Sequence, residues 1–304
     1  MRDMKIAVLM STYNGEKYII EQIESILAQK CEMDFDLWVR DDGSTDSTVD
    51  ILNKYQAEGK LKWYSGENLK PAKSFMDLIM KCRGYDFYAF ADQDDYWYSN
   101  KLQRGINAIK EMRSEALYFS NARLVDDKLS YLGRFVYRHK IHCDFYSLVI
   151  SGGVLGCTVM FNRNIADRMY EAGVPDKITM HDCYAALVCS IFDGEIIYDN
   201  EATLDYRQHS NNVVGSQSGK VGALKDRIRK IFKPAYVSIA EQASSVLKIF
   251  ENELSDEKKQ WLMKVSEYRN SFANALKLAF SRKPKYNSKN MAVTLRFSIL
   301  MRKH

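Results

Sequence analysis

FYAFADQDDYWYSNKL, residues 87–102, joins a short apolar run to a cluster of acidic side chains. Phe87–Ala91 predicts a buried strand, and the run Asp92-Gln93-Asp94-Asp95 follows directly at its end. Residues two positions apart in an extended backbone point the same way, so Asp92 and Asp94 can face one cation. Oxygen ligands at this density favour Mg²⁺ or Mn²⁺, with a diphosphate completing the shell. A solvated acidic turn is the alternative, but the apolar strand before the run favours a metal site.

The sequence before this stretch alternates strand and helix patterns. Predicted strands lie at 5–10, 36–40 and 61–64, and predicted helices lie at 16–29, from a cap at Ser44 or Asp46 to 57, and at 71–82. This order predicts an α/β fold with a parallel sheet covered by helices on both faces. Ligands of such sheets bind at the carboxyl ends of the strands, where polar clusters stand at 11–14, 41–46 and 92–95. Three converging clusters predict a nucleotide site.

The sequence after residue 121 is less regular. The Gly-rich stretch 151–161 predicts a loop that enters a strand, and 180–192 predicts a helix. Two short strands are expected at 195–198 and 203–206, and the chain from 219 onward is helical in composition.

Two small clusters are candidate contacts for a nucleotide base. In Asp41-Asp42-Gly43-Ser44, one aspartate is enough for a turn and helix cap, so the other is available to accept the N3–H of a pyrimidine. Tyr13 could stack on that base, and Ser11 could hydrogen-bond near it.

Two later clusters offer groups for catalysis and for phosphate binding. His181-Asp182 opens a predicted helix, where Asp182 could remove the proton of an attacking hydroxyl; a helix cap beside a histidine is the alternative. Arg207 could hold phosphate oxygens, and His209 is a candidate metal or phosphate ligand. Both of these could instead be ordinary surface residues.

Taken in order, these motifs resemble the bacterial family-2 nucleotide-sugar glycosyltransferases. The matching stretches are KIAVLMSTYNGEKYIIEQIESILAQ (5–29), LWVRDDGSTDSTVDIL (37–52), ENLKPAKSFMDLI (67–79), FYAFADQDDYWYSNKL (87–102), GGVLGCTVMFNR (152–163), MHDCYAAL (180–187) and YRQHSNNVVG (206–215). ADQDDYW, MHD and YRQHSNN together resemble the rhamnosyltransferase branch, which builds O-antigens, capsules and related wall polysaccharides. The resemblance implies a GT-A fold, with a Rossmann-like, mostly parallel sheet.

The resemblance also implies roles for single residues. Ser11 and Tyr13 would flank the pyrimidine, and Asp42 would accept its N3–H. Lys73, where many relatives carry Arg, would approach the diphosphate or base. Asp92 would face the donor, and Asp94 would bind the metal with Asp95 in support. Asp182 would be the catalytic base, with His181 beside it.

An inverting transfer is therefore expected, from a dTDP- or UDP-linked sugar to a glycan or lipid-linked glycan, with Mg²⁺ or Mn²⁺. The implied domains are a catalytic domain at 1–218, with a nucleotide-binding half (1–120) and an acceptor-binding half (121–218), and a basic helical region at 219–304. Three other functions remain open: the same chemistry with a UDP-hexose, a non-catalytic scaffold in polysaccharide assembly, and a dinucleotide-binding oxidoreductase. The missing GxGxxG after the first strand speaks against the last of these.

Composition places the chain among ordinary globular proteins, with 46% hydrophobic and 27% charged residues. Six cysteines without a CxxC pair indicate reduced thiols. The first apolar run is too short for a secretory signal, and no window approaches the ~20 apolar residues of a spanning helix. We therefore expect a cytoplasmic protein.

The net charge of +5 hides an asymmetry between the two parts of the chain. Residues 219–304 hold 19 Lys/Arg and 7 Asp/Glu, so the rest, with 25 against 32, is acidic. Basic and apolar residues mix at 225–233 and again at 291–303, as in segments that lie on an anionic membrane surface. Packing on the catalytic domain or dimerisation are the alternatives, and no motif indicates nucleic-acid binding.

Overall fold

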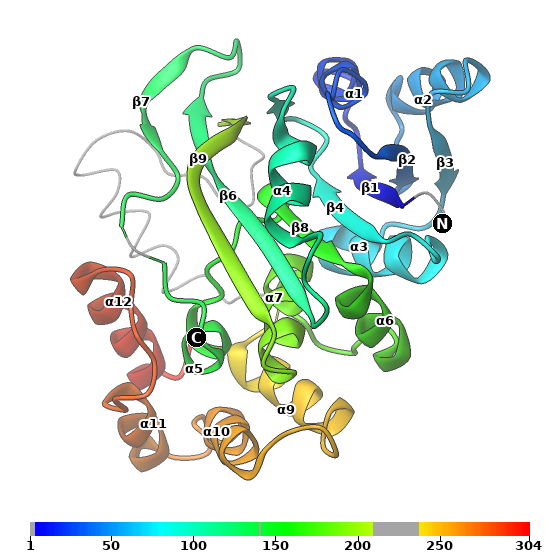
Figure 1. Ribbon diagram of the computed structural model, residues 1–304. Coiled ribbons are helices and arrows are strands. Elements are labelled where there is room, and N and C mark those ends of the chain that lie inside the picture. Colours follow the sequence, from blue (N-terminus) through cyan, green and yellow to red (C-terminus); the bar gives the residue numbers. More distant parts are fainter. Residues whose placement is uncertain (1–3, 140, 209–236) are drawn as a thin grey trace.

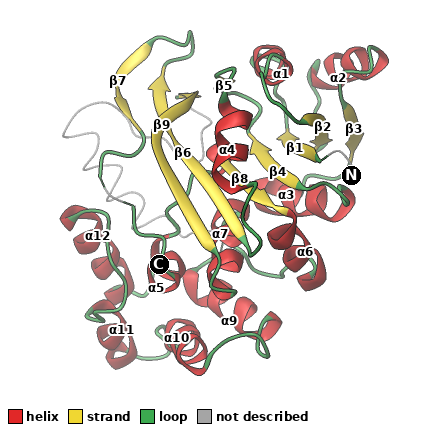
Figure 2. Ribbon diagram, viewed as in Figure 1, coloured by secondary structure: helices red, strands yellow, loops and turns green. Residues whose placement is uncertain are grey.

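The computed structural model describes residues 4–139, 141–208 and 237–304 (Figure 1). Within these residues the strands form one nine-stranded sheet in the order β3-β2-β1-β4-β8-β6-β9-β5, with β7 paired to β6. Helices lie on both sides of it (Figure 2). This is the expected α/β architecture, with a sheet covered by helices on both faces.

The four strands predicted in the first third of the chain lie side by side in the sheet and run parallel to one another. They are β1 (Lys5–Thr12), β2 (Asp34–Asp41), β3 (Lys62–Ser65) and β4 (Phe87–Ala91). The helices between them are α1 (Ile19–Leu27), α2 (Thr48–Ala57) and α3 (Lys70–Lys81). All these elements lie within a few residues of their predicted positions.

Alternation along β1 explains why both faces of the sheet are covered. Ile6, Val8 and Met10 belong to one buried cluster, together with α1 and α4 (Lys101–Ile109). Ala7 and Leu9 belong to the other, together with α3. A strand that is apolar on both faces needs helices on both, as the continuous run Ile6–Met10 indicates.

One strand in the middle of the sheet runs in the opposite direction to its neighbours, and β6 and β9 beyond it run parallel to each other. β8 (Val159–Asn162) runs antiparallel between β4 and β6 (Ala116–Val125). The Gly-rich loop and the strand predicted at 151–161 are present, separated by a short 3-10 turn at Gly156–Thr158. Two further strands, β5 (Tyr96–Trp97) and β7 (Tyr131–Phe135), are short additions to the sheet.

The two short strands predicted between 195 and 206 are one strand, β9 (Glu195–Arg207), so that prediction was wrong. β9 pairs with β6 along its length, and the register shifts between the pairs Ser120–Asp199 and Asn121–Ala202. The shift leaves Asn200 and Glu201 as extra residues on β9. The polar residues in the middle of the segment, which suggested a break between two strands, thus form a bulge within one strand.

Three further helices lie between residues 145 and 191. They are α5 (Phe145–Ser151), α6 (Arg163–Ala172) and α7 (His181–Ile191), the last at the position predicted for a helix. α7 is buried along almost its whole length, so it passes through the core below the sheet. None of the six cysteines, all of which the structure describes, forms a disulfide.

The described part of the basic region is helical, as predicted. It contains α9 (Ile239–Ile249), α10 (Asp256–Ser266), α11 (Phe272–Ala279) and α12 (Lys289–Leu300). A serine side chain caps each N-terminus by accepting a backbone N–H; these caps are Ser238, Ser255, Ser271 and Ser288. The residues predicted at 225–233 lie outside the described part of the chain.

These helices pack on the preceding part of the chain and share one of its buried cores. Gln242 accepts hydrogen bonds from the N–H and the hydroxyl of Thr179, just before α7, both at 2.7 Å. At the other end of α7, Lys258 Nζ donates to the carbonyls of Ser190 and Ile191, each at 2.9 Å. A cation there satisfies carbonyls that a helix C-terminus leaves unpaired. No helix among the described residues is both long and apolar enough to cross a bilayer.

Candidate active site

A cavity of about 1030 Å³ opens at the carboxyl ends of β1, β2 and β4, where the polar clusters were predicted to converge. Loops after these three strands form its walls, together with the start of α7 and the loop before β8. The predicted site residues that line it are Ser11, Tyr13, Asp42, Asp92, Asp94, His181 and Asp182. Segments more than 170 positions apart in the sequence thus meet in one site.

Gln93 locks the loop after β1 to the loop after β4. Thr12 Oγ1 and the Tyr13 N–H both donate to its side-chain oxygen, at 2.5 and 3.0 Å, and its amide donates to the Tyr13 carbonyl at 3.2 Å. Gly15 lies so close that an added Cβ would overlap the Gln93 side chain. The middle residue of the acidic run therefore fixes the shape of the cavity floor.

The acidic run is divided between the cavity and the protein interior. Asp92 and Asp94 line the cavity, but a turn at Gln93–Asp94 places them there, since β4 ends at Ala91. The extended backbone assumed from the sequence is not the reason. Asp95 is fully buried and accepts a hydrogen bond from the Arg207 N–H at 3.3 Å.

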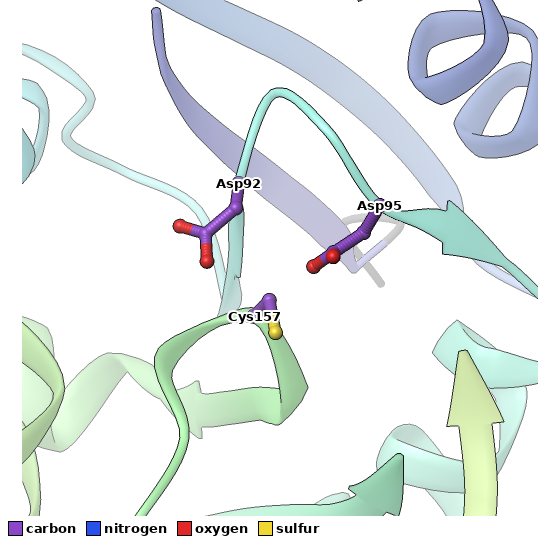
Figure 3. Close-up of side chains that lie close together, drawn as sticks. All are labelled: Asp92, Asp95 and Cys157. Carbon is purple, nitrogen blue, oxygen red and sulfur yellow. The ribbon is translucent and has the colours of Figure 1, made fainter. Parts of the chain in front are cut away.

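The carboxyl groups of Asp92 and Asp95 lie close to the thiol of Cys157. Figure 3 shows Asp92 and Asp95 at the two ends of the loop, with Cys157 between them; ligand atoms of the three lie within 4.8 Å of one another. Burial, followed by the charges of Asp94 and Asp182, raises the pKa of Asp92 to about 8. Burial and the nearby carboxylates also raise the pKa of Cys157 well above its usual range, so the thiol stays protonated.

This arrangement fits a hard divalent cation at the cavity side of the loop. Asp92 and Asp94 bring carboxyl oxygens to the cavity wall, and ionised carboxylates are the ligands that Mg²⁺ and Mn²⁺ prefer. A cation bound there would favour the ionised form of Asp92, because its positive charge opposes the burial and the negative charges that raise the pKa of this group. The protonated Cys157 offers no thiolate, and Asp95 faces inward. The donor set that suits such a cation is therefore the pair Asp92 and Asp94.

Arg207 lies beneath the acidic run and does not line the cavity. Its Nε donates to the Asp94 carbonyl at 2.8 Å, another nitrogen donates to the Asp127 carbonyl, and a third pairs with Glu21 at 2.6 Å. The guanidinium also stacks on Tyr18, 4.5 Å from the ring centroid. In this position Arg207 supports the loop that carries Asp94, and its predicted phosphate contact remains a prediction.

The two aspartates after β2 have separate positions. Asp41 accepts hydrogen bonds from the N–H groups of Gly43 and Ser44, at 3.0 and 2.9 Å, and so forms the turn. Gly43 has a φ of +82°, a conformation that favours glycine. Asp42 is left to line the cavity, where the buried guanidinium of Arg40 contacts it.

The lysine expected near the diphosphate lies elsewhere. Lys73 is exposed on α3 and does not line the cavity, whereas Lys70 at the start of the same helix does. Ser11 lines the cavity and its hydroxyl hydrogen-bonds Ser74 at 2.7 Å, while Tyr13 presents a half-exposed ring. Lys70 is thus the cation of α3 that the cavity can use.

Asp182 enters the cavity from the first turn of α7. Its carboxyl accepts the Cys183 N–H at 2.6 Å and is almost fully buried. Burial raises its pKa to about 6, which suits a base working near neutral pH. A Cβ added at Gly156 would lie 3.1 Å from the carboxyl, so a glycine in the facing loop leaves the group room.

His181 beside it is a neutral, buried ring. Burial lowers its pKa to about 3, and the ring stacks on Phe75 at 3.8 Å between centroids. The edge contact with Phe90 holds it from a second side, at 4.6 Å. His181 thus fixes the start of α7, where Asp182 stands. His209 lies outside the described residues.

Comparison with known proteins agrees with this geometry. Residues 7–168 match the family model "Glycosyl transferase family 2". The chain belongs to glycosyltransferase family 2. Among curated proteins, dTDP-rhamnosyl transferase RfbG of Shigella flexneri is 30% identical over 224 residues, which cover 68% of this chain and 74% of that protein.

Solved structures of glycosyltransferases share the fold. TarS 1-349 of S. aureus in complex with UDP-GlcNAc has a TM-score of 0.56 at 17% identity, covering 97% of this chain and 90% of that one. The mannosyltransferase PcManGT of Pyrobaculum calidifontis, in complex with GDP-Man and Mn²⁺, has a TM-score of 0.56 at 15% identity, covering 99% and 75%. At these identities the likeness concerns the fold, and it confirms the GT-A architecture of this family-2 enzyme.

Sequence reasoning missed three residues that shape this glycosyltransferase site. The sequence predictions give no site role to Gln93, to Arg40 at the end of a predicted strand, or to Lys70 just before a predicted helix. The signal for Gln93 was its neutral side chain between aspartates, which can both donate and accept. Arg40 stood out as a charge at the end of an otherwise apolar strand.

Proposed function

We propose that this family-2 glycosyltransferase is an inverting enzyme that transfers a sugar, with rhamnose from dTDP-rhamnose as the expected donor. The acceptor would be a growing cell-surface polysaccharide or a lipid-linked oligosaccharide. One observation carries the proposal: Asp92 and Asp94 line the same cavity as Asp182, a buried carboxyl with a pKa of about 6. Sugar transfer of this kind needs carboxylates that hold a cation beside the diphosphate and a base that deprotonates the acceptor.

The cavity would hold the donor across its floor. Asp42 would accept the N3–H of the pyrimidine with Tyr13 beside the ring, as the resemblance implies, while Lys70 offers a positive charge for the diphosphate. Asp94 would hold the cation, with Asp92 toward the donor. A bound Mg²⁺ or Mn²⁺ supplies positive charge against the charge that develops on the departing nucleoside diphosphate. The Mn²⁺ in the PcManGT complex supports this choice.

Asp182 would start the transfer. Its ionised carboxylate accepts the proton of the acceptor hydroxyl, whose oxygen forms a bond to the anomeric carbon. The bond from that carbon to the diphosphate oxygen breaks, and its electron pair leaves with the nucleoside diphosphate. Attack from the face opposite the leaving group inverts the anomeric centre.

Two donors compete within this proposal. The similarity to RfbG supports dTDP-rhamnose, while the fold shared with TarS in complex with UDP-GlcNAc supports a UDP-linked sugar. Thymine and uracil present the same N3–H to Asp42, so the described contacts favour neither. We also propose that the enzyme works at the cytoplasmic face of the membrane, because a lipid-linked acceptor would be found there.

A screen of nucleotide sugars tests the function. Release of nucleoside diphosphate is measured for dTDP-rhamnose and a panel of UDP-sugars, with Mn²⁺, Mg²⁺ or EDTA, for wild type, Asp94→Ala and the surface control Glu171→Ala. We expect one donor to be turned over with metal, by wild type and the control but not by Asp94→Ala. Absence of turnover, with no nucleotide raising the melting temperature, would leave a scaffold role instead.

A further inference from the structure

Two helices near the C-terminus carry a row of exposed apolar side chains each. On α11, Phe272 and Leu276, followed by Phe280 just after the helix, have exposed fractions of 62%, 44% and 62%. The corresponding row on α12 is Val293 and Phe297, followed by Met301 just after the helix, with exposed fractions of 67%, 47% and 44%. Both rows follow the spacing i, i+4, i+8, so each forms one stripe along its helix.

These stripes are not the packing faces of the helices. α11 buries Ala275, Leu278 and Ala279, and α12 buries Ser298 and Ile299, against each other and the rest of the core. Each helix is therefore apolar toward the protein and again on an exposed row. Single exposed apolar residues are ordinary, but six on two contacting helices indicate a binding surface.

The chain segment that carries both stripes is strongly basic. Residues 271–304 contain eight Lys/Arg and no Asp/Glu; the basic residues are Lys277, Arg282, Lys283, Lys285, Lys289, Arg296, Arg302 and Lys303. All except Arg296 are exposed. Lys283 pairs with Glu257 of α10 at 2.9 Å, and a second copy of this chain would bring its own cations against the rest of this basic segment. A partner that accepts apolar side chains between basic ones is an anionic bilayer, whose interior takes the former and whose headgroups attract the latter.

The position of these helices suits that partner. Figure 1 shows α11 and α12 at one end of the molecule, away from β1–β3. Their connections lead to the cavity wall: the His304 ring hydrogen-bonds the Ile150 carbonyl at 2.7 Å, and the Lys285 N–H donates to Ser147 at 2.9 Å, both on α5. The chain runs from α5 through Gly152 to Leu155 and Gly156, which line the cavity.

We propose that the α11–α12 face, made of the six stripe residues and the exposed Lys/Arg of residues 271–304, binds the surface of an anionic lipid bilayer. Its purpose rests on the proposed function, because a membrane-bound enzyme would meet a lipid-linked acceptor at its own cavity. Its test does not, since lipid binding is measured without any substrate.

Sedimentation with vesicles tests the proposal on the full chain. Wild type is mixed with vesicles of phosphatidylcholine alone or with 30% phosphatidylglycerol, beside the variant Phe272→Ser/Phe280→Ser/Phe297→Ser. The control variant Ile20→Ser/Leu132→Ser/Val174→Ser changes side chains of similar exposure elsewhere. We expect wild type and control to bind the anionic vesicles, and the stripe variant to bind at least tenfold more weakly.

Charge reversal gives a second arm. Lys277→Glu/Lys285→Glu should weaken binding to anionic vesicles by much more than tenfold, because removing one cation near such a surface weakens binding roughly fivefold (about 1 kcal/mol). Equal pelleting of wild type and both variants, or equal binding to neutral and anionic vesicles, would overturn the proposal. So would a wild-type dimer that the stripe variant converts to a monomer. Turnover of soluble donor should be the same in all these variants, which separates a failure here from a failure of the proposed enzyme.

Discussion

Replacing Asp182 with asparagine separates a catalytic base from a structural helix residue. The substitution keeps the size of the side chain and an oxygen that can accept the Cys183 N–H, but removes the group that takes a proton. General-base catalysis contributes roughly 10²–10⁴ in rate, so we expect donor turnover to fall by that factor. Nucleotide binding should survive, because Asp42, Asp92 and Asp94 are unchanged.

The pH dependence of kcat/KM gives a second test of Asp182 as the base. Because the pKa of Asp182 is raised to about 6, kcat/KM of wild type should rise with pH to a plateau above a midpoint near 6, falling about tenfold per unit below it. The profile of Asp182→Asn should lack this step.

The substitution Asp182→Asn should lower activity but raise the free energy of unfolding above pH 7. In the unfolded chain the carboxyl ionises near pH 4, and in the fold only near pH 6, so its contribution to folding stability falls as pH rises between these values. Two pH units correspond to about 3 kcal/mol, an upper value for the gain of Asp182→Asn above pH 7. Urea unfolding at pH 8 and pH 4 measures it, and the gain should vanish at the lower pH.

Asp176→Asn, an exposed neighbour in the loop before α7, is the matched control and should behave as wild type. The reasoning fails if Asp182→Asn keeps more than a tenth of wild-type turnover. It fails equally if the wild-type profile shows no step between pH 5 and pH 7.

Three further substitutions test the supports of the site. Lys258→Met removes the two hydrogen bonds that end α7 and should lower the free energy of unfolding by about 1–3 kcal/mol in urea titrations, with Lys259→Met unchanged. Arg207→Met should weaken Mn²⁺ binding by about 10-fold or more in calorimetry, because the loop of Asp94 loses its support; unchanged affinity would contradict this. Gln93→Ala should raise the KM for donor more than it lowers kcat, and a pure kcat effect would count against its role in shaping the floor.

Much of the part from β1 to β4 was predictable, because the sequence patterns that mark its strands and helices are local. An apolar run such as Ile6–Met10, followed by polar residues, shows both the strand and its end. The positions of Asp42, Asp92 and Asp182 at one cavity follow from strand ends and a helix start. The side of the loop that each carboxyl faces does not, because a turn at Gln93–Asp94 replaces the extended backbone assumed.

The rest depends on contacts between distant segments. Nothing in the sequence near β8 indicates that it inserts antiparallel between β4 and β6. That β9 is one strand and not two depends on its pairing with β6. Arg207 looks like a free cation in the sequence, but the carbonyls that hold it come from Asp94 and Asp127. Lys70 and Lys73 differ only in their positions around one helix, which packing sets. The serine caps of α9–α12, in contrast, were visible signals that local reasoning overlooked.

A crystal structure with Mn²⁺ and the donor found by the screen, or its unreactive analogue, tests the central claim most directly. The account predicts the pyrimidine at Asp42, the metal about 2.0–2.2 Å from an oxygen of Asp94, and the Asp182 carboxylate on the open face of the anomeric carbon. A nucleotide bound outside this cavity would contradict it. So would a metal held by Asp95 and Cys157 without Asp94.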